Sequence, residues 1–376
     1  LKNGNAVRVN KAYKKETEGA VSIEIPKRYS GTLTHIIGYT DSSNNGVSGL
    51  EKGMNSILKS DNSISVSYEI DSTGRMLSGA GYSIDYGQTD TFVKLTVDKE
   101  IQMILENAMS VVESGAAVII DAENGKIKAT VSRPDYDPYN IADALNDEAA
   151  PLINRALYSY NVGSVFKPCL AAAAIENGKA DYQYNCSGAF EHSGLNFKCH
   201  KSSGHSVLGL KSAISQSCNT YFYTLGLELG ADAVYKTAES FRFSKPLDLG
   251  SGIISSAGSF PGKEALLASP AALINLSIGQ GDLMLSPVAI SLMYCAIVNN
   301  GKYYMHMVKG EGITPRKWEE AGWTQPAPQL PGLEILLDDV ETFAQNVMCQ
   351  HYIISYGDNT EAMTNLCQIL GIEIIR

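Results

Sequence analysis

Ser164 and Lys167 form the first pair of residues whose types and spacing could support a reaction. They stand in Gly163-Ser164-Val165-Phe166-Lys167, at the start of an apolar stretch with helical spacing. Residues three apart lie on one face of a helix, so the lysine amine can reach the serine hydroxyl. A serine hydroxyl is a weak nucleophile until a base takes its proton, and a partly desolvated lysine with a lowered pKa is such a base. The pair indicates nucleophilic catalysis by Ser164 with Lys167 as general base.

The same Ser-x-x-Lys spacing occurs a second time, at Ser56 and Lys59, and Ser60-Asp61-Asn62 follows it directly. In this copy the two short motifs lie on consecutive turns, so they cannot converge on one substrate from separate elements. We interpret the copy as an exposed helix end. The spacing by itself is therefore a weak signal.

Ser217 and Asn219 are better-separated partners for Ser164. Ser217-Cys218-Asn219 begins 53 residues after Ser164, on a different element, and that separation permits convergence. Ser217 could relay a proton and Asn219 could bind a substrate amide. Serine and asparagine also cap helices, and their types alone leave both interpretations open.

Four residues near this second motif have side chains that bind zinc: Cys186, Cys199, His205 and Cys218. Three thiolates and one imidazole form a closed tetrahedral ligand set for a structural Zn²⁺. Their separations of 13, 6 and 13 residues differ from those of a short Cys-x-x-Cys finger. A metal bound at Cys218 would fix the backbone on both sides of it, and so would orient the second motif.

Other interpretations of these residues stay open. His200 and His192 are near enough in the sequence to replace His205 as a ligand. The chain has 7 cysteines, an odd number that argues against a purely disulfide-linked scaffold. A Cys186–Cys199 disulfide and buried free thiols are the two alternatives to a metal site.

The composition predicts a folded protein with more than one domain. The chain has 376 residues, of which 44% are apolar and 19% charged, whereas an ordinary domain has about 100–200 residues. A net charge of −10 argues against sequence-independent binding to nucleic acid. No apolar run reaches the ~18 residues that span a bilayer. The chain begins at Leu1 without a basic, apolar leader, so we expect any targeting segment upstream.

The elements that must position these residues follow from the pattern of apolar residues and turns. Residues 97–112 predict an amphipathic helix, and Glu123-Asn124-Gly125 between two apolar runs predicts a hairpin over residues 116–131. An apolar helix begins near Ser164 and ends at Asn177-Gly178. Further helices are expected near residues 208–229 and 286–298. Residues 1–95 are polar and rich in turns, with one short helix over 49–58. The pattern predicts an α+β fold with an antiparallel sheet and flanking helices.

Together with these motifs, several others make the chain similar to the transpeptidase domain of class B, high-molecular-mass penicillin-binding proteins, of the elongation type. They follow in the order of that family and span residues 30–310: His35-Ile36-Ile37-Gly38-Tyr39, Gly46-Val47-Ser48-Gly49-Leu50-Glu51-Lys52, Leu95-Thr96-Val97-Asp98, Ser132-Arg133-Pro134, Gly163-Ser164-Val165-Phe166-Lys167-Pro168, Ser217-Cys218-Asn219-Thr220-Tyr221-Phe222 and Gly279-Gln280-Gly281-Asp282.

The resemblance implies a function. In that family the serine of the first motif is acylated by the D-Ala-D-Ala end of a peptidoglycan stem peptide, and β-lactams acylate the same serine. It implies that Ser164 is the nucleophile and Lys167 its base, with half of the oxyanion hole from the backbone N–H of Ser164. Ser217 would relay a proton, and Asn219 would bind a substrate amide. No cofactor is needed for this chemistry, and the corresponding stretch of elongation-type members resembles a metal-ligand site.

The chain departs from the family at its third motif, Lys-[Thr/Ser]-Gly. No such triplet occurs in the sequence, and the nearest, Lys236-Thr237-Ala238, lies upstream in a helical stretch. The missing strand provides a cation and an oxyanion-hole donor, each worth about 2–4 kcal/mol of transition-state stabilisation. Lys309 is a candidate for that cation. A catalytically impaired binding or sensor module is therefore the alternative to an active D,D-transpeptidase.

The resemblance also predicts domains, partners and location. We expect an N-terminal pedestal over residues 1–95, a transpeptidase domain over 96–310 and a segment of unclear assignment over 311–376. The match over residues 35–52 argues against a Ser-x-x-Lys β-lactamase, which lacks that region. Expected partners are stem peptides, β-lactams and a membrane glycosyltransferase, and no nucleic acid. The expected location is the extracytoplasmic face of the bacterial membrane, with an anchor upstream.

Overall fold

The computed structural model of the chain describes residues 31–58, 65–69, 71–73, 82–85 and 93–298. Its α-helices in these ranges are α1 (Thr34–Ile37), α2 (Gly49–Gly53), α3 (Asn55–Leu58), α4 (Lys99–Ala108), α5 (Ile141–Leu145), α6 (Lys167–Glu176), α7 (Leu210–Ser215), α8 (Asn219–Ser240), α9 (Lys263–Ala268), α10 (Pro270–Leu276) and α11 (Pro287–Val298). Two 3-10 helices are η2 (Met109–Val111) and η3 (Gly163–Phe166). The strands are β1 (Ser65–Tyr68), β2 (Tyr82–Asp85), β3 (Gly115–Ile120), β4 (Ile127–Arg133), β5 (Gln183–Cys186), β6 (Ala189–His192), β7 (Leu195–Lys198) and β8 (Ser206–Gly209).

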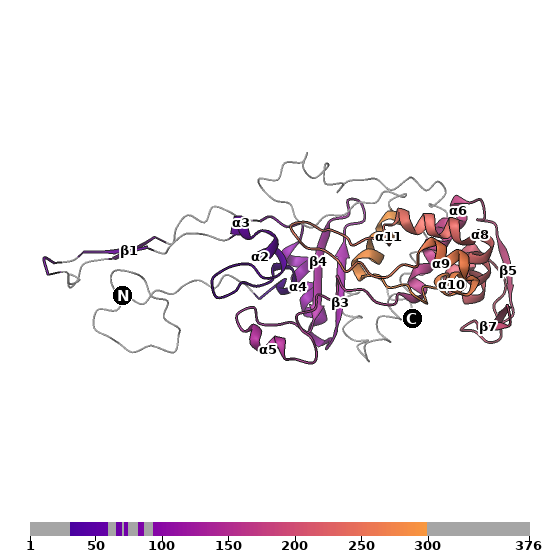
Figure 1. Cartoon of the computed structure of the whole chain (residues 1–376), viewed down its shortest axis with the longest axis horizontal. Helices are drawn as coiled ribbons and strands as arrows, with labels where there is room; N and C mark the ends of the chain where they lie inside the picture. The colour runs from indigo at the N-terminus through magenta and orange to yellow at the C-terminus, as the bar shows by residue number, and fades with distance from the viewer. Residues whose placement is uncertain (1–30, 59–64, 70, 74–81, 86–92, 299–376) are drawn as a thin grey trace.

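The antiparallel hairpin β3–β4 stands in the middle of the molecule (Figure 1). Side chains alternate between the two faces of a strand. In β3, Ala117 and Ile119 pack with the apolar face of α4, whereas Val118 and Ile120 pack against the main core, next to α11. Asp98 caps α4, because its side chain accepts hydrogen bonds from the backbone N–H groups of Glu100 and Ile101. The predicted α+β fold, with its hairpin and flanking helices, is confirmed.

Helix α6 forms the centre of the main core. Every residue from Lys167 to Ala174 is buried, and a helix that is apolar on all sides must be covered on all sides. Helix α8 packs along it, and α10 also packs on α8. The helix ends where the sequence predicts, with Gly178 in the left-handed conformation at φ 68°.

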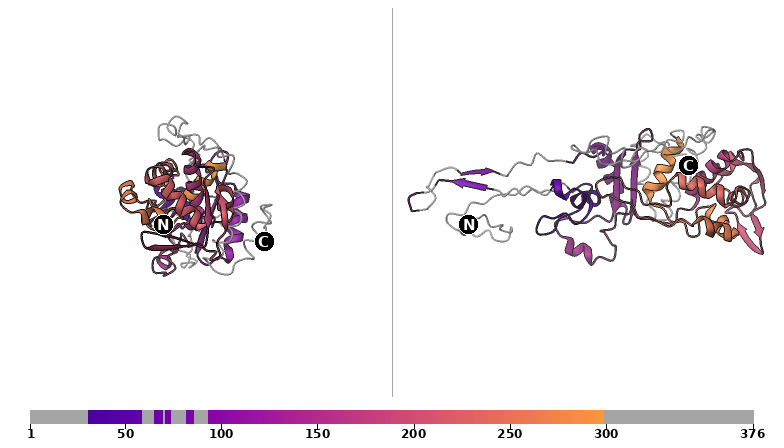
Figure 2. Two further views of the ribbon diagram at one scale, coloured as in Figure 1. Left: turned by 90° about the vertical axis from the view of Figure 1, so that its right-hand side faces the viewer. Right: turned by 45° about the horizontal axis from the view of Figure 1, so that its top comes forward.

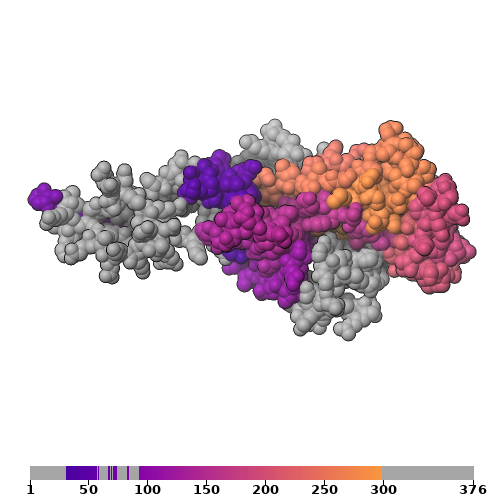
Figure 3. Space-filling view, turned by 60° about the horizontal axis from the view of Figure 1, so that its bottom comes forward, coloured from indigo at the N-terminus to yellow at the C-terminus, as the bar shows by residue number. Residues whose placement is uncertain are grey.

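Residues 183–209 contain strands that the sequence analysis does not predict. They form two small antiparallel sheets, β5 with β8 and β6 with β7. These strands have only four residues each, too few for a clear alternation of apolar and polar side chains. In Figures 1 and 2 they lie at the end of the molecule opposite β1 and β2, and the pink surface in Figure 3 belongs to this region.

Two other predicted helices are interrupted. The stretch 208–229 divides into β8, α7 and α8, with a break at residues 216–218, and α8 continues to Ser240 with a kink at Gly230. The stretch 49–58 divides into α2 and α3. Gly53 packs so closely on the backbone of Ser251 that no side chain fits there, and this contact lies at the division.

The N-terminal residues 31–58 pack on the later part of the chain. Ile36, Leu50 and Met54 belong to the same buried cluster as Val165 and Phe166. Strands β1 and β2 pair with each other in the following segment. The domain boundaries near 95 and 310 stay predictions, and residues 311–376 lie outside the described ranges. Among the described helices, none has the length and apolar character needed to cross a membrane.

Candidate active site and thiol cluster

Ser164 lies in the 3-10 turn η3, and α6 begins three residues later at Lys167. Backbone hydrogen bonds connect this turn and the residues before it to the segment after α10. The backbone N–H of Gly163 donates to the carbonyl oxygen of Gly279 at 2.9 Å, and Tyr160 exchanges two backbone hydrogen bonds with Leu285. Ser164 itself is half-buried, so its hydroxyl is placed at the edge of the core and not inside it.

Lys167 is fully buried, and its amine is surrounded by oxygen atoms. Nζ lies 3.1 Å from Ser164 Oγ and 2.9 Å from Ser217 Oγ. It lies 2.7 Å from both the Ser217 carbonyl oxygen and Asn219 Oδ1. The Phe222 ring covers the amine from another side, with its centroid 5.6 Å from Nζ. The structure therefore brings together all four residues that the sequence predicts for catalysis.

The hydrogen-bond capacity of the amine indicates what it does for the hydroxyls. A carbonyl oxygen and an amide oxygen only accept hydrogen bonds, so the Ser217 carbonyl and Asn219 take two N–H groups of Lys167. One position on Nζ remains, and it faces the two serine hydroxyls. In the neutral amine that position is the lone pair, which can accept the proton of Ser164.

Burial favours this neutral form. It lowers the pKa of Lys167 to about 7, against the opposing effect of the nearby thiol groups of Cys218 and Cys199. A base whose pKa lies near the working pH combines a deprotonated population with adequate proton affinity. The structure thus gives Lys167 the property that a general base needs.

The second motif occupies the break between α7 and α8. The N–H groups of Ser217 and Cys218 donate to the carbonyl oxygens of Ile214 and Ala213, which ends α7. Ser217 takes the left-handed conformation with φ 47°, unusual for serine and costly by about 1 kcal/mol. The capping alternative is not observed, because α8 has no side-chain cap and the Asn219 side chain contacts Lys167 instead.

Of the second copy of the motif, only the part up to residue 58 is described. Ser56 lies in α3, on the N-terminal segment. Lys59 and Ser60-Asp61-Asn62 lie outside the described residues, as do Lys309 and the whole region where the third motif of the family would follow.

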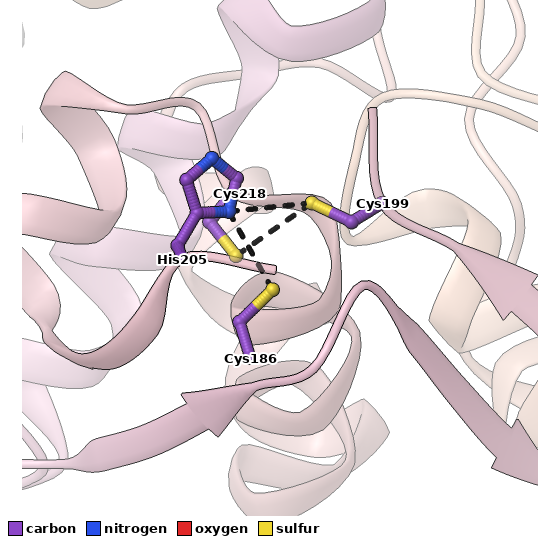
Figure 4. Close-up of side chains that lie close together, drawn as sticks. All are labelled: Cys186, Cys199, His205 and Cys218. Carbon is purple, nitrogen blue, oxygen red and sulfur yellow. Dashed lines mark hydrogen bonds between the residues drawn. The ribbon is translucent and has the colours of Figure 1, made fainter. Parts of the chain in front are cut away.

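The four predicted metal ligands converge on one point (Figure 4). Their ligand atoms all lie within 4.8 Å of one another. His205 Nδ1 is 3.5 Å from Cys186 Sγ and 3.6 Å from Cys199 Sγ, and Cys199 Sγ is 3.9 Å from Cys218 Sγ. We call these four residues the thiol cluster. Cys186 ends β5, Cys199 follows β7, His205 precedes β8, and Cys218 precedes α8.

Three of the six separations among these atoms match the edges of a zinc tetrahedron, and the other three lie within 4.8 Å. With Zn–S bonds of about 2.3 Å and Zn–N bonds of about 2.05 Å, tetrahedral angles place two sulfurs about 3.8 Å apart and a sulfur and a nitrogen about 3.6 Å apart. The three measured separations differ from these values by about 0.1 Å at most. Three thiols and an imidazole are also a donor set that zinc prefers, so the residues fit the ion.

The surroundings of the cluster shift the pKa values of Cys186 and Cys218 in opposite directions. Burial raises the pKa of Cys186, but hydrogen bonds from Thr220 and from the backbone of Gly188 and His205 outweigh it, so that the pKa is lowered overall. Burial raises the pKa of Cys218 to about 12. A bound cation would reverse that effect, because a metal ion deprotonates the thiols that coordinate it.

The alternatives for this cluster fare differently. Cys186 and Cys199 are free thiols in the structure, not a disulfide. His200 lies beside the cluster, with Nδ1 3.9 Å from Cys199 Sγ, whereas His192 on β6 stacks on Phe190. His205 is therefore the imidazole that joins the three thiols.

Comparison with known proteins identifies the family. The model of the penicillin-binding protein transpeptidase domain matches residues 115–330. The chain belongs to this transpeptidase family. The match extends past the predicted boundary at 310, and residues 299–330 of it lie outside the described part of the structure.

Transpeptidases are also among the relatives of the chain. Stage V sporulation protein D of Bacillus subtilis (strain 168) is 28% identical over 302 residues, which cover 76% of this chain and 45% of that protein. Peptidoglycan D,D-transpeptidase PbpA of Mycobacterium tuberculosis (strain CDC 1551 / Oshkosh) is 32% identical over 228 residues, which cover 53% of this chain and 44% of that protein. The chain thus spans less than half the length of these curated relatives.

Solved transpeptidase structures share the fold. A penicillin-binding protein, PBP2, from Helicobacter pylori superposes with a TM-score of 0.68 at 21% identity, covering 86% of this chain and 65% of that one. The penicillin G acyl-enzyme complex of penicillin-binding protein A from M. tuberculosis gives a TM-score of 0.65 at 24% identity, covering 84% and 77%. At these identities the likeness concerns the fold alone.

Sequence reasoning missed the backbone that holds the reactive turn. The carbonyl of Gly279 contacts Gly163 directly, and a side chain on Gly279 would meet the Gly163 carbonyl oxygen at 1.9 Å. The only signal was the triplet Gly279-Gln280-Gly281, which the family resemblance includes without assigning it a role. Phe222, which covers the Lys167 amine, was part of the same resemblance and was not singled out.

Proposed function

We propose that this chain is the D,D-transpeptidase part of a longer cell-wall enzyme that cross-links peptidoglycan stem peptides. One observation carries the proposal: a single buried amine, Lys167 Nζ, lies within hydrogen-bonding distance of Ser164 Oγ, Ser217 Oγ and Asn219 Oδ1. A buried base that touches one nucleophile and one relay hydroxyl suits acyl transfer through a serine ester.

In the proposed reaction, Ser164 Oγ attacks the carbonyl carbon between the two terminal D-alanines as Lys167 takes the hydroxyl proton. The backbone N–H of Ser164 supplies one of the donors that stabilise the oxyanion. The proton then passes by way of Ser217 to the leaving amine, the terminal D-Ala departs, and an ester on Ser164 remains. Asn219 binds an amide of the donor peptide. The amino group of a second stem peptide attacks the ester, which releases Ser164 and forms the cross-link.

The test is intact-protein mass spectrometry after reaction with a fluorescent penicillin. The wild-type protein should gain one penicillin mass, and the Ser164→Ala variant should gain none. Thermal unfolding of the Ser164→Ala variant checks that it still folds. We expect it to fold, because the Lys167 amine stays buried when the serine hydroxyl is removed. Labelling that persists in Ser164→Ala would remove the assignment of the nucleophile.

A second candidate is a binding or sensor module that is acylated but does not turn over. It is favoured by the absence of a Lys-[Thr/Ser]-Gly triplet from the sequence. A second measurement distinguishes the two candidates: whether the acyl group passes from Ser164 to an added D-amino acid. Transfer of the acyl group from a D-Ala-D-Ala peptide supports the enzyme, and acylation without transfer supports the module.

We also propose that the thiol cluster binds one structural Zn²⁺ through Cys186, Cys199, His205 and Cys218. The match of three of the six separations to the edges of a zinc tetrahedron supports this proposal. The ion would supply no chemistry to the reaction and would hold the backbone at Cys218. Metal analysis of protein purified without chelator should give one zinc per chain. Less than about a tenth of that, with reactive thiols at all three cysteines, would end this proposal.

The predicted setting remains part of the proposal. We place the chain at the extracytoplasmic face of the bacterial membrane, anchored by a segment upstream, and acting beside a membrane glycosyltransferase. One structure that shares the fold is a complex between PBP2 and MreC from H. pylori, at 21% identity and a TM-score of 0.64. Fractionation of cells that express the full-length protein, followed by protease treatment of spheroplasts, would test the location.

A further inference from the structure

Gln280 is an exposed residue next to the reactive turn to which no role has been given. It stands in the loop between α10 and α11, in the triplet Gly279-Gln280-Gly281. A Cβ added to Gly163 would lie 3.7 Å from the nitrogen of the Gln280 carboxamide. Because Gly163 has no side chain, the carboxamide lies beside bare backbone, one residue before Ser164.

The backbone under this side chain is fixed. The N–H of Gln280 donates to the carbonyl oxygen of Asn275 at 2.9 Å, and the N–H of Gly279 donates to that of Leu276 at 2.8 Å. The carbonyl oxygen of Gly279 in turn accepts the N–H of Gly163. The buried Gly279, with φ 73°, leaves no room for a side chain against Gly163. The loop and the turn that carries Ser164 therefore behave as one unit.

The carboxamide on this loop has no hydrogen-bond partner among the residues that the structure describes, although it can both donate and accept a hydrogen bond. Exposed glutamines are common on surfaces, where water satisfies them. What distinguishes Gln280 is that its Cα is held by hydrogen bonds on both sides and that its side chain ends beside the nucleophile's turn. Substrate-binding groups are typically placed on a backbone that is ordered before the ligand arrives.

We propose that Gln280 binds a backbone amide of the peptide substrate on the Gly163 side of Ser164. A carboxamide presents an N–H donor and a C=O acceptor, and so does a peptide group, so the two can pair through one or two hydrogen bonds. This inference rests on the proposed transpeptidase function and adds a residue that distinguishes a peptide from a small β-lactam. A compact bicyclic lactam without a side chain has no extended peptide to offer this group.

The experiment compares two acyl donors on the same variants. One is a peptide ester that ends in D-alanyl-D-lactate, and the other is 6-aminopenicillanic acid. Gln280→Ala should lower kcat/KM for the peptide ester about three- to tenfold, the effect of one or two lost hydrogen bonds, chiefly through a higher KM. The acylation rate with 6-aminopenicillanic acid should change less than about twofold, and the thermal midpoint should not move.

Two further variants sharpen the comparison. Gln280→Glu keeps the size but removes the donor, so it should lose as much as Gln280→Ala or more. Gln183→Ala, which removes an equally exposed glutamine from β5, is the matched control and should leave both rates unchanged. An unchanged ratio of peptide to lactam rates in both Gln280 variants overturns the inference. So does a parallel loss of both rates with a lower thermal midpoint, because that result shows a structural role. If the wild-type protein is not acylated at Ser164 at all, the proposed function has failed, and the inference with it.

Discussion

Two buried polar regions meet at one tripeptide, and they are completed in different ways. Around Lys167 the protein supplies every partner, since four oxygen atoms surround the amine. In the thiol cluster the protein supplies four ligand atoms that all lie within 4.8 Å of one another. The first region is complete as folded, whereas the second is the one for which we propose a bound ion. A catalytic base must stay free to exchange a proton. A structural site, in contrast, can stabilise the fold through a metal that holds its ligands together.

Ser217-Cys218-Asn219 joins the two regions. Ser217 and Asn219 contact Lys167, and Cys218 between them belongs to the thiol cluster. Ser217 is held in a left-handed conformation that serine rarely adopts, and we expect an ion bound at the next residue to oppose its relaxation. Damage to the Lys167 region should therefore stop the chemistry, whereas damage to the thiol cluster should loosen it.

The largest effect is expected from Lys167→Met, which removes the base but keeps a buried side chain of similar length. Penicillin acylation of Ser164 should slow by at least about a hundredfold, because among the described residues no other base contacts the hydroxyl. The fold should persist, as measured by thermal unfolding. Lys179→Met, at a surface lysine paired with Glu228, is the control and should label at the wild-type rate. Equal rates for Lys167→Met and the control would place the base elsewhere.

Removal of the metal should have the next largest effect. A zinc chelator should lower the thermal midpoint and slow acylation by about tenfold, since second-motif residues lose their anchor. Added zinc should restore both quantities, which stopped-flow labelling and calorimetry can follow. If the chelator-treated protein keeps the wild-type acylation rate and thermal midpoint, the thiol cluster does not influence the Lys167 region.

Cys218→Ser tests the connection between the thiol cluster and the Lys167 region. Serine keeps the size but binds zinc poorly, so the variant should bind less than stoichiometric zinc and should label several-fold more slowly. Cys169→Ser is a matched control, because Cys169 is equally buried on α6 but lies outside the cluster. Its zinc content should be unchanged. A Cys218→Ser protein with full zinc would show that Cys218 is not a ligand.

The pH dependence of the wild-type protein should report the protonation state of Lys167. Burial lowers its pKa from 10.5 to about 7, so the neutral, proton-accepting form predominates above about pH 7. Acylation should accelerate nearly tenfold per pH unit below that value and level off above it. The matching measurement is the labelling rate from pH 5 to pH 9 at constant ionic strength. A rate that rises steadily to pH 9 would mean that the amine is charged at neutral pH.

The smallest effect is expected at the second Ser-x-x-Lys copy. Ser56→Ala should leave the labelling rate, the zinc content and the thermal midpoint within experimental error, because α3 lies outside both regions. Mass spectrometry of the peptide that contains residue 56 checks the result directly. A penicillin adduct on Ser56 would reverse the choice between the two copies.

Local signals were enough to predict several elements of this chain. Asp98 caps α4 because its side chain reaches the N–H groups of the first turn, and Gly178 ends α6 because it accepts a positive φ. Ser164 and Lys167 meet because they are three residues apart on a helical turn. These outcomes depend on neighbours within a few residues, and the sequence determines them by itself.

Only the tertiary structure decided the rest. No residue near Lys167 in the sequence predicts that its amine is fully buried. The pKa of this lysine is lowered because α8 packs over it and buries the amine. The break at Ser217, the Gly279 contact that holds the Ser164 turn, and the convergence of Cys186, Cys199, His205 and Cys218 each join residues that are distant in the chain. Spacing restricts which residues can meet within one element, but distances between elements are set by packing. The chemistry of this protein depends on those distances.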